Sequence, residues 1–348
     1  QCRGRGCTLL DEMVAALALA LVTALLGADL YRRWAQNRAL DVPNARSSHH
    51  RPIPRGGGLV IVLGFAIGLA AWLNQGGALS PRAWGWLAGA LLIAAVSFVD
   101  DLRPLPAAPR LATHALGALA LTIVGVQERE TPLPIALVLA FVWVALVTNV
   151  YNFMDGIDGL AASQAVIAGI ALALAGTIVN NPLVTAGAGI LAAAAAGFLG
   201  HNLPPARLFM GDVGSTFLGF NFAGLMLLGN LGVGGGRLPI EFGVVVLAPF
   251  LFDSIVTLVR RIISGERWYA AHRSHYYQRL VIRGASHAQV TGLYALLAVV
   301  AAVAALAGLV LQEPLRQALA VAAYAPMLAV VALVWRLEAS NVVTPGQS

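Results

Sequence analysis

Acidic, amide and histidine side chains gather in a few short segments of this sequence that also contain glycine. These segments are D-D-L-R at 100–103, N-V-Y-N-F-M-D-G-I-D-G-L at 149–160, N-L-P-P-A-R-L-F-M-G-D-V-G-S at 202–215 and H-R-S-H-Y-Y-Q-R-L at 272–280. Carboxylates beside Asn, with no thiolate nearby, suit a hard cation such as Mg²⁺, which takes one or two carboxylates plus substrate phosphates. Flanking arginines can hold a diphosphate or a lipid headgroup. Together these groups are what phosphoryl transfer requires.

Each of these segments also has a structural interpretation. Asp100 and Asp101 could cap a helix end, and D-G-I-D-G resembles a turn or a calcium loop, although it lacks the distal Glu of an EF-hand. His272 and His275 have the i, i+3 spacing of metal ligands, but no third ligand is evident in the sequence. Contact with a phosphate or sugar and simple solvation at an interface are the alternatives for this pair.

A few polar residues fall within or beside apolar runs. Asp253 lies about ten residues inside an apolar run, where an acid is a functional candidate by default. A buried hydrogen-bond partner on a neighbouring helix is an equal interpretation of Asp253. We expect His114 to be structural, and His49 and His50 to lie at an interface.

The elements that must position these segments are apolar helices. The 348 residues are 59% hydrophobic and 11% charged, with a mean hydropathy of +0.78, whereas soluble domains carry about 25% charged residues. The composition therefore predicts an all-α, polytopic integral membrane protein with about eleven transmembrane helices. The apolar runs long enough to span a bilayer lie at 13–31, 57–74, 83–99, 111–127, 132–151, 159–179, 183–201, 214–231, 239–261, 288–311 and 315–336.

The distribution of arginine predicts the orientation. The loops that follow odd-numbered spans hold 15 arginines and those that follow even-numbered spans hold four, and positive loops stay in the cytoplasm. We therefore expect the N-terminus outside, the C-terminus in the cytoplasm, and the protein in the bacterial inner membrane. All the segments with candidate chemistry fall on odd-numbered loops, which places the active site on cytoplasmic loops. We expect an N-terminal tail at 1–12, a single transmembrane catalytic domain at 13–338 and a short cytoplasmic tail at 339–348.

Taken in order, the segments resemble those of one known family. H-H-R-P-I-P-R-G-G-G at 49–58, together with the four segments quoted above, is similar to the polyprenyl-phosphate N-acetylhexosamine-1-phosphate transferases. This is the MraY/WecA superfamily, glycosyltransferase family 4. The resemblance implies transfer of a sugar-1-phosphate from a UDP-sugar to undecaprenyl phosphate with release of UMP. It also implies Mg²⁺, for which Mn²⁺ can substitute, membrane lipids as surroundings, a homodimer and no nucleic-acid partner.

The resemblance also implies roles for individual residues. Asp212 matches the Mg²⁺ ligand, and Asp100 matches the acid that deprotonates or positions the lipid phosphate, with Asp101 beside it. Asp155 and Asp158 match acids near the nucleotide that have catalytic roles. The positions that match nucleotide-binding residues are Asn152, Asp158, Asn202 and Phe209. Those that match residues in contact with phosphate or sugar are His272, His275, Arg279 and, on a looser alignment, Arg51 and Arg55.

The sequence departs in two ways from one branch of the superfamily, and these departures indicate which branch it resembles more. The sequence has H-R-S-H where the muramyl-pentapeptide transferase branch carries three histidines, and it lacks that branch's lysines near Asp100 and Asp101. It is more similar to the WecA/WbpL branch that begins O-antigen or other surface polysaccharide synthesis, which implies UDP-GlcNAc or UDP-FucNAc as donor. The alternatives are a phospho-MurNAc-pentapeptide transferase and, from other classes, an ion-coupled secondary transporter or an inactive scaffold.

Overall fold

The structure is a computed structural model that describes residues 5–41, 52–103, 105–125, 132–267 and 272–339. Arg51, His49 and His50 lie outside the described residues, so what the sequence predicts for them stays a prediction. The helices are α1 Arg5–Ala35, α2 Leu59–Asn74, α3 Pro81–Leu102, α4 Ala107–Gly125, α5 Leu133–Phe153, α6 Leu160–Ile178, α7 Pro182–Asn202, α8 Gly211–Asn230, α9 Ile240–Val246, α10 Ala248–Ile263, α11 Tyr276–Ile282, α12 His287–Val310, α13 Leu315–Ala322 and α14 Ala325–Ala339.

Each apolar run predicted as a span overlaps a helix or a pair of helices. Local sequence explains where several of them begin. The Ser80 side chain accepts the backbone N–H of Ala83 at 3.3 Å at the start of α3, and the Asn181 side chain accepts that of Val184 at 3.1 Å at the start of α7. In both cases proline occupies the first helical position, where its missing N–H costs nothing.

The number of helices that can cross a membrane is smaller than the number of predicted spans. Among the described residues, seven helices are long and apolar enough to cross, or eight if one bent pair counts as a span. Helix α8 is not among the seven, although it is buried along nearly its whole length. Its glycines and its Asn221 face other helices rather than lipid, so α8 does not need an apolar exterior. The protein is a multi-pass, all-α membrane protein, with one small two-stranded ribbon.

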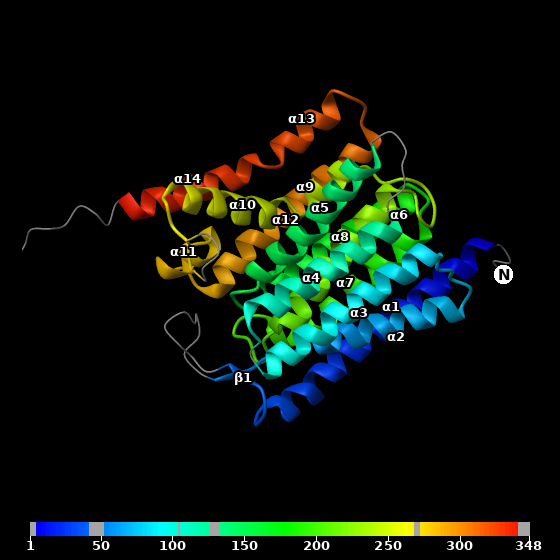
Figure 1. Ribbon diagram of the computed structural model, residues 1–348, viewed down its shortest axis with the longest axis horizontal. Helices are drawn as coiled ribbons and strands as arrows, with labels where there is room; N and C mark the ends of the chain where they lie inside the picture. Colours follow the sequence, from blue (N-terminus) through cyan, green and yellow to red (C-terminus); the bar gives the residue numbers. More distant parts are fainter. Residues whose placement is uncertain (1–4, 42–51, 104, 126–131, 268–271, 340–348) are drawn as a thin grey trace, which may run out of the picture.

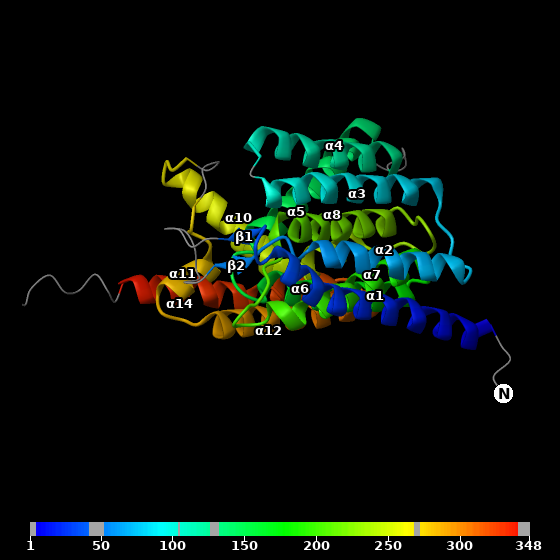
Figure 2. The same cartoon turned by 90° about the horizontal axis from the view of Figure 1, so that it is seen from below.

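The prediction of one continuous helix at 239–261 is wrong. Helices α9 and α10 meet at Leu247 with a bend of 77°. Pro249, in the first turn of α10, has no N–H to continue the helical hydrogen bonds. The Gln164 side chain on α6 instead donates to the Val246 carbonyl at 3.1 Å, which satisfies part of the interrupted backbone. In Figure 2, α10 accordingly points away from the main bundle.

Small residues let the first helices pack closely. Ala16, Ala20 and Ala24 recur every fourth residue of α1 and are fully buried. A Cβ at Gly64 or Gly68 on α2 would lie less than 3 Å from a backbone carbonyl of α1. This close approach of backbones is typical of membrane helices, because lipid supplies no hydrophobic force to drive them together. It fixes the position of α2 and of the segment before it.

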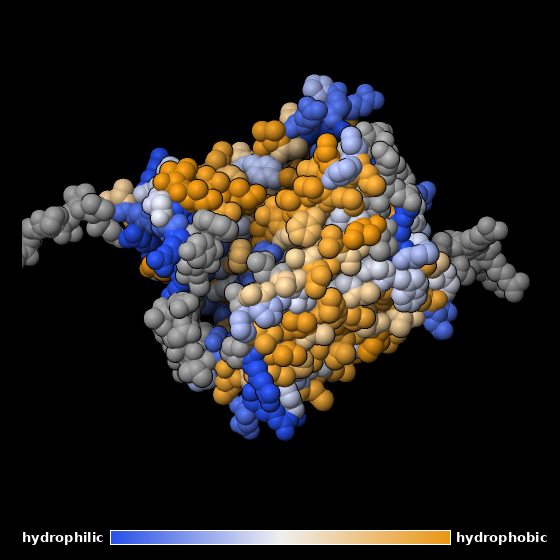
Figure 3. Space-filling view, viewed as in Figure 1, coloured by the Kyte–Doolittle hydropathy of each residue, from blue (hydrophilic) through white to orange (hydrophobic). Residues whose placement is uncertain are grey.

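The loops that carry the candidate residues lie at one end of the bundle. The ribbon of β1 (Leu40–Asp41) and β2 (Ile53–Pro54), whose strands are antiparallel, lies at this end with α11, and α1 begins at the other end (Figure 1). Apolar residues cover the side of the bundle between its polar ends (Figure 3). The prediction that the polar motifs share one face is thus met by the geometry.

Candidate active site

The end of α3 is joined to the start of α8 by one carboxylate. Asp101 is 5% exposed, and its two oxygens accept the backbone N–H groups of Asp212 and Val213, both at 3.0 Å. These N–H groups belong to the first turn of α8, where a helix has no partners of its own and favours a negative charge. Gly211 has φ +73°, and a Cβ there would lie 2.5 Å from Asp101 Oδ2. Only glycine allows this approach.

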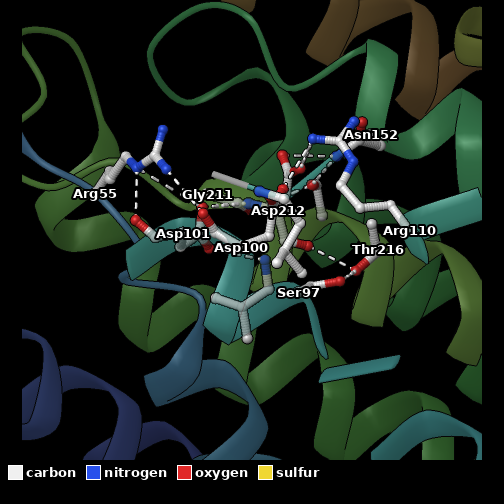
Figure 4. Close-up of polar contacts among 12 residues, drawn as sticks. Arg55, Ser97, Asp100, Asp101, Arg110, Asn152, Gly211, Asp212 and Thr216 are labelled. Atoms are coloured by element: carbon white, nitrogen blue, oxygen red, sulfur yellow. Dashed lines mark hydrogen bonds and ion pairs between the residues drawn. The ribbon is translucent and has the colours of Figure 1, made fainter. Parts of the chain in front are cut away.

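Arg55, predicted to contact phosphate, binds the end of α3. Its guanidinium donates to the backbone carbonyls of Asp101 at 2.9 Å and Asp100 at 3.1 Å (Figure 4). The Arg55 Nε atom is also 4.0 Å from Asp101 Oδ1. A cation at this position satisfies carbonyls that the helix leaves unpaired and complements the helix dipole. The described contacts of the Arg55 side chain are therefore with the end of α3.

Arg110 is the residue of the site that sequence reasoning missed. Its Nη1 atom lies 2.8 Å from Asp100 Oδ2 and 3.1 Å from Asp212 Oδ2, so that one guanidinium bridges a predicted catalytic acid and the predicted Mg²⁺ ligand (Figure 4). In the sequence, Arg110 is one of the 15 arginines that predict the orientation, and nothing further was predicted for it. The available signal was its place shortly after D-D-L-R, on the first turn of the next helix.

An amide from a fourth helix completes this cluster. Asn152, near the end of α5, donates to Asp212 Oδ1 and to the Ser215 hydroxyl, both at 3.0 Å. The Asp212 side chain remains 32% exposed, whereas that of Asp100 is 6% exposed. Asp212 therefore keeps an accessible carboxylate at a site built from α3, α4, α5 and α8.

Two residues predicted to bind the nucleotide connect loops to one another. Asp158 accepts the N–H of Ala206 at 3.0 Å through Oδ2, and its Oδ1 lies 3.1 Å from His287 Nδ1. Asn202 accepts the N–H of Gly159 at 3.1 Å and donates to the Leu208 carbonyl at 3.0 Å. Both side chains are buried. The contact of Asp158 and Asn202 with a nucleotide stays a prediction. The structure shows in addition that each side chain holds neighbouring segments together.

The segment that holds Phe209 runs beside the residues before α2. Gly57 donates its N–H to the Phe209 carbonyl at 2.9 Å, and Gly58 donates to the Met210 carbonyl at 2.7 Å. The Phe209 ring is half-buried. The end of the 49–58 motif thus lies beside the middle of the 202–215 motif, as one site requires.

The last motif divides between a loop and the short helix α11. His272 and His275 lie with ring centroids 5.0 Å apart. Burial, followed by the nearby His275 and Arg261, lowers the pKa of His272 to about 4. Arg279, predicted to contact phosphate, is paired with Glu338 of α14 and lies over the Tyr276 ring. Nothing in the sequence predicts the pairing of Arg279 with Glu338.

Asp155 lies in the loop between α5 and α6 and is partly exposed. Burial, followed by the charges of Asp212, Asp101 and Asp158, raises its pKa to about 8. A carboxyl group surrounded by others holds its proton unless a cation offsets their charge. The electrostatics of the site therefore favour a cation near Asp155 and Asp212.

The carboxylates of the site suit one kind of metal ion better than others. No group of three or more His, Cys, Asp or Glu among the described residues is placed to hold one. Zinc and calcium sites made by protein alone need more ligands than this. Mg²⁺ binds through one or two carboxylates and is completed by substrate phosphates and water. Asp212, with Asp155 nearby, fits Mg²⁺ of this kind.

Known proteins share this sequence pattern. Residues 83–230 match the profile of Glycosyl transferase family 4. The chain is 30% identical over 294 residues to the probable undecaprenyl-phosphate N-acetylglucosaminyl 1-phosphate transferase of Bacillus subtilis, covering 80% of this chain and 81% of that protein. The chain belongs to glycosyl transferase family 4. The resemblance to the MraY/WecA superfamily is thereby confirmed.

Other relatives come from two branches of this family. The decaprenyl-phosphate N-acetylglucosaminephosphotransferase of Mycobacterium tuberculosis is 26% identical over 324 residues, covering 83% of this chain and 80% of that protein. The phospho-N-acetylmuramoyl-pentapeptide-transferase of Desulforudis audaxviator is 29% identical over 346 residues, covering 86% and 99%. Membership of the family therefore does not determine which sugar the protein transfers.

Proposed function

We propose that this protein transfers a sugar-1-phosphate from a UDP-N-acetylhexosamine to undecaprenyl phosphate, giving undecaprenyl-diphosphate-sugar and UMP. The observation that carries the proposal is the Arg110 bridge between Asp100 and Asp212, with Asn152 on the second oxygen of Asp212. This cluster places acids and a cation at one end of a membrane bundle. A cytosolic nucleotide sugar and a phosphate at the headgroup level can meet there.

The reaction forms one P–O bond and breaks another. An oxygen of the lipid phosphate attacks the β-phosphorus of the UDP-sugar, and the bond from that phosphorus to the oxygen that bridges the α- and β-phosphates breaks. UMP leaves with the bond electrons. Asp100 orients the attacking phosphate and accepts its proton, while Arg110 moves from the two carboxylates to the phosphate oxygens. Mg²⁺ bound at Asp212 would neutralise the donor diphosphate.

The donor sugar follows from the last motif. H-R-S-H at 272–275 is unlike the triple histidine of the muramyl-pentapeptide branch, and the first relative above is named for N-acetylglucosamine. We infer UDP-GlcNAc or a related sugar such as UDP-FucNAc, and a place at the first membrane step of O-antigen or other surface polysaccharide synthesis. Phospho-MurNAc-pentapeptide is the second candidate, favoured by the Desulforudis relative.

A donor screen tests this function. Purified protein in detergent is given Mg²⁺, undecaprenyl phosphate and one radiolabelled donor at a time, and labelled lipid is extracted. We expect lipid product from a UDP-N-acetylhexosamine and none from a UDP-MurNAc-pentapeptide. Asp212→Asn should lose the activity, whereas Glu241→Gln, which changes an acid in the first turn of α9, should not. Full activity of Asp212→Asn would refute the metal assignment.

Two further measurements address the route and the setting. Exchange of labelled UMP into the UDP-sugar without lipid acceptor would refute direct attack and favour a phospho-aspartate intermediate. We further propose that the enzyme works as a homodimer in the bacterial inner membrane and accepts Mn²⁺ in place of Mg²⁺. Light scattering in detergent and replacement of Mg²⁺ in the transfer assay test these points. A transporter is disfavoured because the acids of the site lie at one end of the bundle.

A further inference from the structure

A buried carboxyl group in α10 is surrounded by hydrogen-bond donors. Asp253 is 2% exposed. Its Oδ1 atom lies 3.1 Å from His275 Nδ1 and accepts the N–H of Tyr276 at 3.0 Å. Its Oδ2 atom accepts the N–H of Tyr277 at 3.0 Å and the hydroxyl of Tyr294 at 2.5 Å. A buried acid with so many partners is built into the fold.

Two of these contacts hold the start of α11. Tyr276 and Tyr277 are its first residues, and their N–H groups have no partner within the helix. The Tyr277 hydroxyl donates in turn to the Phe153 carbonyl at the end of α5, at 2.9 Å. A Cβ at Gly156 would lie 2.1 Å from that hydroxyl. Asp253 is therefore linked, through one tyrosine, to the D-G-I-D-G loop of the site.

The contact between Asp253 and His275 determines the tautomer of the imidazole ring. Oδ1 of Asp253 is an acceptor that faces His275 Nδ1 inside the protein, so Nδ1 carries the proton and Nε2 is left to accept. The ring lies 5.8 Å from that of Tyr277, with an angle of 23° between the planes, and 6.2 Å from that of Phe153. The carboxylate thus fixes both the tautomer of His275 and, with these rings, its orientation.

We propose that Asp253 is a positioning residue for the transfer reaction. It acts through His275, whose Nε2 it presents to the donor sugar or diphosphate, while it anchors α11 against the loop that holds Asp155. The proposal rests on the proposed function, because His275 is assigned there to the donor. Asp253 itself lies behind His275 and does not touch the substrate.

A double-mutant cycle tests whether Asp253 acts through His275. Asp253→Asn replaces one acceptor oxygen by an amide N–H that faces donors. We expect kcat to fall about 10- to 100-fold with a smaller change in KM for the UDP-sugar, as for other carboxylates that orient a functional histidine. In a His275→Ala background, Asp253→Asn should lower kcat further by less than about twofold. Losses that multiply, or full activity of Asp253→Asn alone, would overturn the proposal.

A matched control separates positioning from stability. Asn181 is buried at the opposite end of the bundle, and its side chain makes three hydrogen bonds, to Val233, Gly236 and Val184. Asn181→Asp exchanges the same two atoms as Asp253→Asn, in the reverse direction. It should lower the temperature of thermal unfolding without changing kcat per folded molecule. A fall in kcat of the same size in Asn181→Asp would show that the effect of Asp253→Asn is general destabilisation.

A measurement on the unmodified protein keeps the proposal testable if Asp253→Asn does not fold. NMR of protein labelled with ¹⁵N-histidine reports which ring nitrogen is protonated, and the His275 signals are those missing in His275→Gln. We expect a proton on Nδ1 and none on Nε2; the opposite tautomer would overturn the proposal. This result does not depend on the donor. Failure of the proposed function would instead appear as no transfer by the unmodified protein from any UDP-sugar.

Discussion

Gly211→Ala places a methyl group against the carboxylate that joins α3 to α8. At φ +73° a side chain costs about 1–2 kcal/mol of conformational energy. The new Cβ would lie 2.5 Å from Asp101 Oδ2, whereas ordinary contact begins at 3.4 Å. Asp101 must therefore move, which weakens at least one of its bonds to Asp212 and Val213, worth about 1.5–3 kcal/mol each. The total loss is about 2.5–5 kcal/mol.

The effect on activity follows from the displacement. The 2.5 Å contact must lengthen by about 0.9 Å, and a misplacement of about 1 Å costs about 100-fold in rate. Gly265→Ala is the matched control, because Gly265 has φ +68° and a Cβ there meets no atom within 4 Å. That variant should lose only the conformational energy and keep its activity.

Both variants are measured for initial rate of sugar-phosphate transfer and for thermal unfolding in detergent. We expect Gly211→Ala to be about 100-fold slower and to unfold at a lower temperature than Gly265→Ala. The reasoning is refuted if the two variants have equal rates and equal unfolding temperatures, since the contact with Asp101 would then have no consequence.

Three further predictions follow from individual contacts. Asn202→Ala removes the buried bonds to Gly159 and Leu208 and should lower the free energy of unfolding by about 1–3 kcal/mol; unchanged stability with weaker UMP binding by calorimetry would instead indicate direct contact with the nucleotide. His272, whose pKa is about 4, should show no NMR titration near pH 6.5, and an inflection there would contradict the structure. Because the unfolded chain binds this proton and the folded chain does not, His272 lowers stability as pH falls from about 6.5 to 4. Arg110→Gln frees two carboxylates and should raise KM for the lipid phosphate while lowering the Mg²⁺ concentration needed for half-maximal rate, each by about fivefold; an unaltered Mg²⁺ requirement would argue against the bridge.

The sequence by itself determined the class of protein, most of its helices and the family. A membrane helix must be apolar over a length set by the bilayer, and that property is visible in one stretch of sequence. The run predicted at 132–151 accordingly lies within one residue of α5 at its first end and two at its last. The break at Leu247 was not predicted, because a proline within an apolar run either kinks a helix or ends it, depending on neighbours such as Gln164.

Only the tertiary structure decided which residues touch. Asp101 lies 111 residues before its partner Asp212. The contacts of Arg110, His287 and Glu338 with predicted site residues were likewise not predicted from the sequence. Asp253 had two equal interpretations until its donors were known. The physical reason is that a helix turns by about 100° per residue, so a small change in how two helices pack brings different side chains together. The alternation of apolar spans and loops places the motifs at one face of the membrane. The packing of the helices then determines which side chains of the motifs are in contact.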